Sequence, residues 1–145
     1  ARVALIIARN IDIKRAVVVA DERESNQRKL LNFGHSAGHA VEACEHFELG
    51  HGNCVSIGMG IIARAAAKHG ICEPELPQRI EDLCARHGLK TRCELTADEI
   101  FAEALHDKKR SGDTIDLVIP HGIGRCSIDR TPLETFHTLI AEGLE

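Results

Sequence analysis

One stretch of the sequence, residues 52–69 (GNCVSIGMGIIARAAAKH), is almost wholly small and apolar up to Arg64. A segment of this length without a polar face predicts a helix that is surrounded by protein on all sides. Gly58 and Gly60 would let another helix approach it closely, and Gly70 is the kind of residue that ends a helix. The sequence therefore predicts a fold in which other helices pack around this one.

Helical spacing of apolar residues continues on both sides of the central segment. Thr96 and Glu99 have the spacing of a capping box, and Thr131 followed by Pro132 is expected to cap the last helix. Val17–Val19 alone would also fit a strand. The further helices are expected at residues 1–21 (two short helices or one kinked helix), 30–46, 73–87, 96–106 and 131–144.

Residues 114–128 change period, because two alternating runs are separated by the turn-forming residues 120–124. This pattern predicts a β-hairpin. The expected fold class is therefore mostly α, a multi-helix domain with one small β-hairpin. At 145 residues, the chain is long enough for one domain with its own core, covering residues 1–145.

Composition excludes several classes of function. A net charge of −4, with no cluster of Lys and Arg, argues against binding to nucleic acid or to a membrane surface. No stretch approaches the roughly 20 apolar residues of a membrane span. The six cysteines have irregular spacings and no secretory segment precedes them, so reduced thiols in the cytoplasm are expected. The chain opens on Ala1 rather than Met, which predicts a fragment or a processed chain.

Three histidines form the candidate site. His35 and His39 are four residues apart, so both imidazoles would lie on one face of a helix. His51 stands between two glycines, and on spacing alone the three could form a zinc site with one open position. The pair lacks the glutamate of a zinc-protease helix, so that motif is rejected. The alternative is an ordinary helix with one hydrogen-bonded buried histidine and one exposed histidine.

Four cations are candidate anion binders if the fold brings them to the histidines. Arg provides a bidentate fork and Lys a point charge, and a phosphate or carboxylate substrate would use both. No glycine-rich dinucleotide fingerprint follows a predicted strand. The candidate cations are Lys14, Arg28, Lys108 and Lys109.

The histidine segment LNFGHSAGHA, residues 31–40, resembles the LNFGHTxGHA signature of the 3-dehydroquinate synthases. The segment that begins at Gly50 and His51 resembles the HGEAVAIGM segment of the same family. The resemblance covers essentially all 145 residues. Further matches follow the family pattern in order: Ile13-Lys14, Asp21-Glu22, Glu24, Arg28 and Asp107-Lys108-Lys109.

The resemblance implies that this is the helical C-terminal domain of a two-domain enzyme, without its N-terminal NAD-binding domain. The family converts a sugar-acid phosphate, 3-deoxy-D-arabino-heptulosonate 7-phosphate, into 3-dehydroquinate and phosphate in the shikimate pathway. The reaction uses NAD and zinc or another divalent metal such as Co²⁺. The resemblance also implies a homodimer at full length, and we expect the chain alone to be inactive.

The resemblance also implies a role for each site residue. His35 and His51 would be two of three metal ligands, the third being a glutamate upstream of Ala1. His39 would face the substrate rather than the metal, which differs from the three-histidine interpretation. The residues expected to hold the phosphate, carboxylate and hydroxyl groups of the substrate are Lys14, Arg28, Asn32 and one of Lys108 and Lys109.

Two positions depart from the family pattern. Ser36 replaces a threonine and keeps the hydroxyl, whereas Asn53 replaces a glutamate and removes a carboxylate beside the expected ligand His51. Two alternatives therefore stay open. One is another sugar-phosphate cyclase, of the 2-deoxy-scyllo-inosose or valiolone type. The other is a non-catalytic helical module that binds a metal or an anion.

Overall fold

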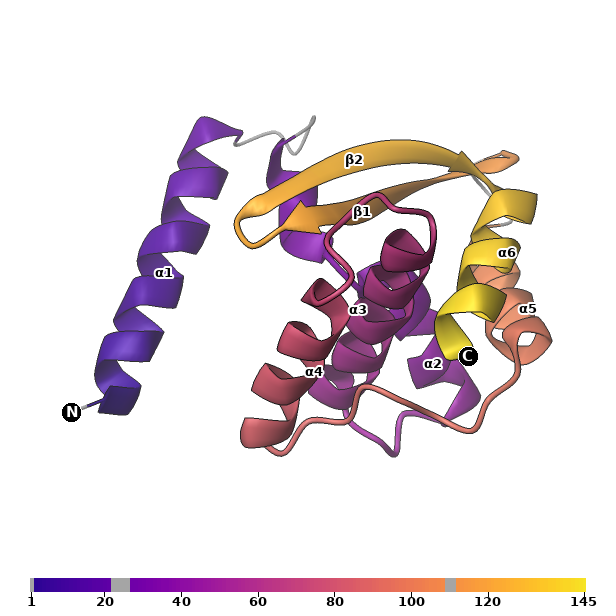
Figure 1. Ribbon diagram of the computed structural model, residues 1–145, viewed down its shortest axis with the longest axis horizontal. Helices are drawn as coiled ribbons and strands as arrows, with labels where there is room; N and C mark the ends of the chain where they lie inside the picture. The colour runs from indigo at the N-terminus through magenta and orange to yellow at the C-terminus, as the bar shows by residue number, and fades with distance from the viewer. Residues whose placement is uncertain (1, 22–26, 109–111) are drawn as a thin grey trace.

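The central element of the computed structural model, which describes residues 2–21, 27–108 and 112–145, is the helix α3 (His51–Lys68). Ile57 and Ile61 are fully buried in its middle. Helices α2, α4 and α6 and strand β1 pack against it, as Figure 1 shows. The predicted central helix is therefore confirmed, and its apolar surroundings explain why the sequence has no polar face before Arg64.

The predicted fold class is confirmed, because the described residues form helices and a single antiparallel hairpin. The elements besides α3 are α1 (Arg2–Ala20), the 3-10 helix η1 (Gln27–Asn32), α2 (His35–Cys44), α4 (Leu76–Arg86), α5 (Ala97–Lys108), β1 (Thr114–Gly122), β2 (Arg125–Pro132) and α6 (Leu133–Leu144). The described parts contain no helix that is both long and apolar enough to cross a membrane.

Helix α1 is one continuous helix and stands apart from the other helices (Figure 1). Of the alternatives for residues 1–21, one helix rather than two is correct, and the strand at Val17–Val19 is wrong. Its main contacts are with η1, and none of its described side chains is buried. The large apolar side chains that it exposes are Val3, Leu5, Ile6, Ile7, Ile11, Ile13 and Val19.

The expected helix over residues 30–46 is wrong at its start, because the chain changes direction at Gly34. Gly34 has φ of 80°, in the left-handed region that glycine adopts without strain. A Cβ there would lie 2.5 Å from Met59 Cγ and 2.7 Å from the carbonyl oxygen of Val55. Helix α2 therefore begins only at His35, after the short helix η1 has ended.

Helices α2 and α3 cross with their backbones in contact. A Cβ on Gly58 would overlap the carbonyl oxygen of Gly34 and lie 2.7 Å from the backbone nitrogen of Gly38. Gly58 therefore serves a close helix contact, as predicted. Gly60 does not, because a Cβ there would meet the carbonyl oxygen of Thr91 at 2.7 Å, in the segment after α4.

The hairpin lies across one end of the helices, with the buried face of β1 toward α3 and α6 (Figure 1). Its turn is shorter than the predicted residues 120–124, since β1 continues to Gly122 and pairs there with Arg125. The register shifts between Pro120 and Gly122. This irregularity accommodates a proline, which has no N–H to donate to a regular ladder.

The expected cap of the last helix is wrong in detail. The N-cap of α6 is Pro132 and it makes no side-chain cap hydrogen bond. Thr131 instead donates its hydroxyl to the carbonyl oxygen of Asp129. The six cysteines, all of them among the described residues, form no disulfide; they are Cys44, Cys54, Cys72, Cys84, Cys93 and Cys126.

The predicted capping box at the start of α5 is present. The backbone N–H of Thr96 donates to Glu99 Oε2 at 2.8 Å, and the backbone N–H of Glu99 donates to Thr96 Oγ1 at 3.3 Å. Thr96→Ala should lower the free energy of unfolding by about 1 kcal/mol, because one helix N–H loses its acceptor. Urea denaturation measures this change.

Thr138→Ala is the matched control for the capping box. The hydroxyl of Thr138 is exposed and donates within its own helix, to the carbonyl oxygen of Glu134. Alanine has the higher helix propensity, so this change should leave stability equal or slightly higher. Equal losses in Thr96→Ala and Thr138→Ala would show that the capping box does not stabilise α5.

Candidate metal centre

Three histidines come together where α2 and α3 begin. His35 is the first residue of α2, His39 lies one turn later, and His51 is the first residue of α3. Each pair of imidazole rings has its centroids 5.5 Å apart. We call this group the histidine triangle. The contact of α2 with α3 therefore joins residues that the sequence places on two separate helices.

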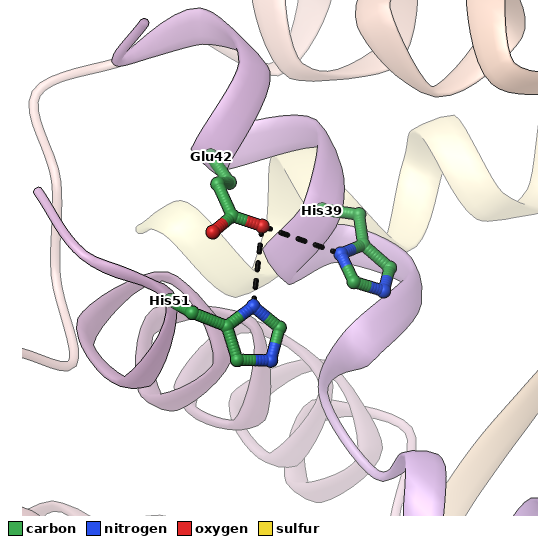
Figure 2. Close-up of side chains that lie close together, drawn as sticks. All are labelled: His39, Glu42 and His51. Carbon is green, nitrogen blue, oxygen red and sulfur yellow. Dashed lines mark hydrogen bonds and ion pairs between the residues drawn. The ribbon is translucent and has the colours of Figure 1, made fainter. Parts of the chain in front are cut away.

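The carboxylate of Glu42 lies beside two of the three rings. Its Oε2 is 3.2 Å from Nδ1 of His51 and 3.4 Å from Nδ1 of His39, as Figure 2 shows. The hydrogen bond to His51 is the largest cause of a pKa of Glu42 below the usual value, so the group is charged. Ligand atoms of His39, Glu42 and His51 all lie within 4.8 Å of one another. Sequence reasoning missed Glu42, although it follows His35 and His39 at helical spacing on α2.

His35 has a different acceptor. Its Nδ1 lies 3.4 Å from the carbonyl oxygen of Phe33. The pKa of His35 is lowered, first because burial disfavours the charged ring and then because His39 and His51 lie beside it. A neutral imidazole is the form that binds a metal. The site thus combines three imidazoles and one carboxylate, which is a donor set that suits zinc or cobalt.

A cavity of about 770 Å³ adjoins the histidine triangle. It lies between η1 and α2 on one side and α5 and the hairpin on the other. Its volume is in the range of small-molecule sites. The polar and charged residues that line it are Lys29, Asn32, His35, Ser36, His39, Glu42, Glu103, His106 and Asp116.

The other residues expected to hold the substrate differ in how near they lie to the cavity and the histidine triangle. Asn32 lines the cavity at the end of η1. Arg28 lies on the same short helix, and its backbone N–H donates to Asp21 Oδ2 at 3.0 Å. Lys14 is exposed on α1, and the structure does not bring it to the histidine triangle. Helix α5 ends at Lys108, two residues beyond the cavity residue His106.

Lys109 lies outside the described residues. Sequence reasoning also missed Lys29, which lines the cavity and forms an ion pair with Asp116 at 2.6 Å. Asp116 belongs to β1, 87 residues away in the chain. No local pattern indicates such a pair, because it depends on how the hairpin lies over η1.

Asn53, where the family pattern has glutamate, forms side-chain hydrogen bonds with backbone groups. Its Nδ2 donates to the carbonyl oxygen of Leu49 at 3.0 Å, and its Oδ1 accepts from the N–H of Lys90 at 2.9 Å. The bond with Lys90 fixes the first turn of α3 to the segment after α4, and the bond to Leu49 holds the chain just before α3. The carboxylate that faces His51 comes instead from Glu42.

Comparison with known families assigns the chain. The family model described as 3-dehydroquinate synthase C-terminal matches residues 1–110. The chain belongs to the 3-dehydroquinate synthase family. A 3-dehydroquinate synthase of Streptococcus suis is 41% identical over 131 residues, which cover 89% of this chain and 37% of that protein. One from Acetivibrio thermocellus is 39% identical over 129 residues, covering 86% of this chain and 36% of that protein. The chain thus spans little more than a third of the length of these synthases.

Two solved structures of other synthases share the fold. A 2-deoxy-scyllo-inosose synthase complexed with carbaglucose-6-phosphate, NAD+ and Co2+ matches with a TM-score of 0.75 and 21% identity, over 92% of this chain and 39% of that chain. A 2-epi-5-epi-valiolone synthase from Streptomyces hygroscopicus, with NAD+ and Zn2+ bound, matches with a TM-score of 0.76 and 23% identity, over 94% of this chain and 39% of that chain. At these identities the likeness concerns the fold alone.

Proposed function

We propose that this chain is the metal- and substrate-binding part of a 3-dehydroquinate synthase. The full-length enzyme would convert 3-deoxy-D-arabino-heptulosonate 7-phosphate into 3-dehydroquinate and phosphate. One observation carries the proposal: in a chain of this family, three imidazoles meet with ring centroids 5.5 Å apart, beside a cavity of about 770 Å³.

His35 and His51 are the proposed metal ligands. They come from different helices that are held in backbone contact, and the lowered pKa of His35 favours the neutral, coordinating form. A third ligand and the NAD site would come from the rest of the full-length protein, which also forms the proposed homodimer. A divalent metal bound here would polarise the oxygen on the carbon that NAD oxidises.

The cavity residues of this chain would hold the substrate. His39 and Asn32 line it together and present groups that can hydrogen bond to hydroxyls or phosphate oxygens. Lys29 at the same wall carries a positive charge that Asp116, also in the lining, balances in an ion pair at 2.6 Å. The proposed roles of Arg28, Lys108 and Lys109 rest on the family resemblance, as does that of Lys14, which lies outside the cavity lining.

Metal titration of histidine variants tests the proposed ligands. His35→Ala and His51→Ala should each raise the Zn2+ dissociation constant by about 100-fold or more, since loss of a ligand exceeds the usual effect of an outer-shell residue. His39→Ala should stay within a few-fold of the wild type. Isothermal titration calorimetry and the absorption of bound Co2+ both measure this.

His87→Ala is the matched control, because His87 is exposed at the C-cap of α4. Its metal affinity should equal that of the wild type. If His39→Ala lost the metal as severely as the other two variants, the site would be a three-histidine site and the proposed division of roles would be wrong.

A chimeric enzyme tests the reaction. The segment of the Streptococcus suis synthase that is 41% identical to this chain would be replaced by this chain. The chimera should release phosphate and form 3-dehydroquinate, and its His35→Ala variant should not. The chain alone, with NAD and Zn2+, should show no turnover. A folded, metal-binding chimera without activity would favour a non-catalytic binding module.

The shared fold of the related cyclases motivates a second candidate function. The same chimera would be given a glucose phosphate, since a 2-deoxy-scyllo-inosose synthase of this fold is complexed with a carba analogue of that class. If the chimera releases phosphate from the heptulosonate phosphate but not from the glucose phosphate, the result supports the 3-dehydroquinate synthase. Release from the glucose phosphate instead would identify a sister cyclase.

A further inference from the structure

We propose that Glu42 is a positioning residue that keeps the ring proton of both His39 and His51 on Nδ1. Each ring then presents the lone pair of Nε2, to the metal in the case of His51 and to the substrate in the case of His39. The roles of the two Nε2 atoms rest on the proposed function. The assignment of Glu42 rests on the contacts of its carboxylate.

A single oxygen makes both contacts. Glu42 Oε2 lies 3.2 Å from His51 Nδ1 and 3.4 Å from His39 Nδ1, and the two rings approach it from different helices (Figure 2). A carboxylate can only accept hydrogen bonds. Both Nδ1 atoms must therefore carry the proton in these contacts, and in a neutral ring Nε2 is then the free ligand atom.

The ring of His35 also has its Nδ1 beside a hydrogen-bond acceptor, but this acceptor is a backbone carbonyl oxygen rather than Glu42. His35 has Nδ1 3.4 Å from the carbonyl oxygen of Phe33, so its free atom is also Nε2. A metal held by His35 and His51 must then use Nε2 of both rings. The acceptor for His51 is Glu42, because the side chain of Asn53 bonds to the backbone of Leu49 and Lys90.

Glu42 is well placed to orient two rings at once. Its side chain is only 16% exposed and follows His39 by three residues on the same helix. A carboxylate behind a ligand histidine fixes the ring orientation and raises the basicity of the coordinating nitrogen. Because one oxygen serves both rings, loss of the His39 ring leaves Oε2 wholly to His51. This agrees with the expectation that His39→Ala spares metal binding.

The competing interpretation is that Glu42 binds the metal directly. A ligand atom of Glu42 lies within 4.8 Å of ligand atoms of His39 and His51, so a metal between them is geometrically possible. Such a metal would bind Nδ1 of the two rings and leave out His35. The nitrogen that carries the metal therefore separates the two roles.

The first experiment uses the metal-free chain at a pH where the imidazoles are neutral. Long-range 1H–15N NMR spectra report which ring nitrogen carries the proton. In the wild type, Nδ1 of His39 and His51 should be protonated. In Glu42→Ala both rings should shift toward the Nε2-protonated form, whereas His35, which Phe33 holds, should not change.

Two variants complete the tautomer experiment. Glu42→Gln keeps an acceptor oxygen, so it should restore the Nδ1 proton on one ring at least in part. Glu45→Ala removes a carboxylate at the C-cap of the same helix and should leave all three spectra as in the wild type. An unchanged His51 tautomer in Glu42→Ala would overturn the proposal.

The second experiment measures the metal directly. Glu42→Ala should raise the Zn2+ dissociation constant by about 10- to 100-fold, the usual effect of removing an outer-shell carboxylate. Glu42→Gln should fall between this variant and the wild type. In the zinc-loaded wild type, the 15N shift of His51 should change at Nε2. A zinc-dependent change at Nδ1 would overturn the proposal and make Glu42 a ligand.

Failure of the proposed function gives a different result from failure of this inference. If the wild-type chain bound no Zn2+, the proposed ligands His35 and His51 would lose their support. The spectra of the metal-free chain would still decide whether Glu42 sets the tautomers of His39 and His51.

Discussion

Gly58→Ala should lower the free energy of unfolding by about 3 kcal/mol, at the upper end of the range for an overpacked core. The added Cβ would overlap the carbonyl oxygen of Gly34 and lie 2.7 Å from the backbone nitrogen of Gly38. Backbone atoms at a helix crossing cannot rotate away as a side chain can. Helices α2 and α3 must therefore separate, which would also open the histidine triangle.

Two measurements check the Gly58→Ala prediction. Urea denaturation should show the loss of stability, and Zn2+ titration should show weaker binding although no histidine has changed. Gly52→Ala, in the first turn of the same helix, is the control because, among the described residues, its Cβ would meet only Leu89 Cδ2, at 3.7 Å. It should keep or slightly raise stability. A similar stability in both variants would contradict the proposed close crossing.

The elements that the sequence predicted well are those whose signals are local. Residues 52–69 predict a buried helix because an apolar surface on all sides is stable only inside a protein. The capping box at Thr96 and Glu99 works within one turn. By contrast, the end of η1 and the start of α2 depend on Gly34, where a Cβ would have no room beside Met59 and Val55 of α3. Such a contact has no signature in the segment 30–46 itself.

The site was predictable to the extent that it follows helix geometry. Spacing places His35 and His39 on one face, and Glu42 could have been found from the same periodicity. The position of His51 beside the other two histidines depends on the crossing of α2 and α3. The ion pair of Lys29 with Asp116 depends on the hairpin, and it could not be predicted from either segment alone.

Spacing and resemblance gave different roles to His39, and the structure places all three rings at equal separations. Equal separation is compatible with three ligands and with two ligands beside a substrate group. The difference between the two interpretations is chemical rather than geometric. The titration of His39→Ala against His35→Ala and His51→Ala therefore decides it, and the tautomer set by Glu42 shows which nitrogen each ring presents.

Arg64→Met should lower the free energy of unfolding by about 3–5 kcal/mol, the usual effect of removing one partner of a buried ion pair. Arg64 is the polar residue that interrupts the apolar run of α3, and it is only 8% exposed. Its Nη1 pairs with Glu81 Oε1 on α4 at 2.5 Å. Its guanidinium also donates to the carbonyl oxygens of Gly143 on α6 and of Thr91.

The large effect follows from what the substitution leaves behind. Methionine fills much of the space but cannot donate, so the two carbonyl oxygens and the Glu81 carboxylate lose a buried partner. Arg64→Met with Glu81→Leu should therefore be less destabilised than the sum of the two single variants, because the double variant does not leave the buried charge of Arg64 without Glu81. It should not regain full stability, since the carbonyl oxygens of Gly143 and Thr91 still lack the donor.

Arg92→Met is the matched control for this buried ion pair. Arg92 lies 3.7 Å from the same Glu81 oxygen, but its side chain is 57% exposed. An exposed pair contributes about 0–1 kcal/mol, because water competes for both charges. Thermal and urea denaturation should therefore separate the two variants clearly. Equal losses of unfolding free energy in Arg64→Met and Arg92→Met would show that the bonds of Arg64 to α4 and α6 do not stabilise the fold. They would also show that burial of this guanidinium does not make its removal more destabilising.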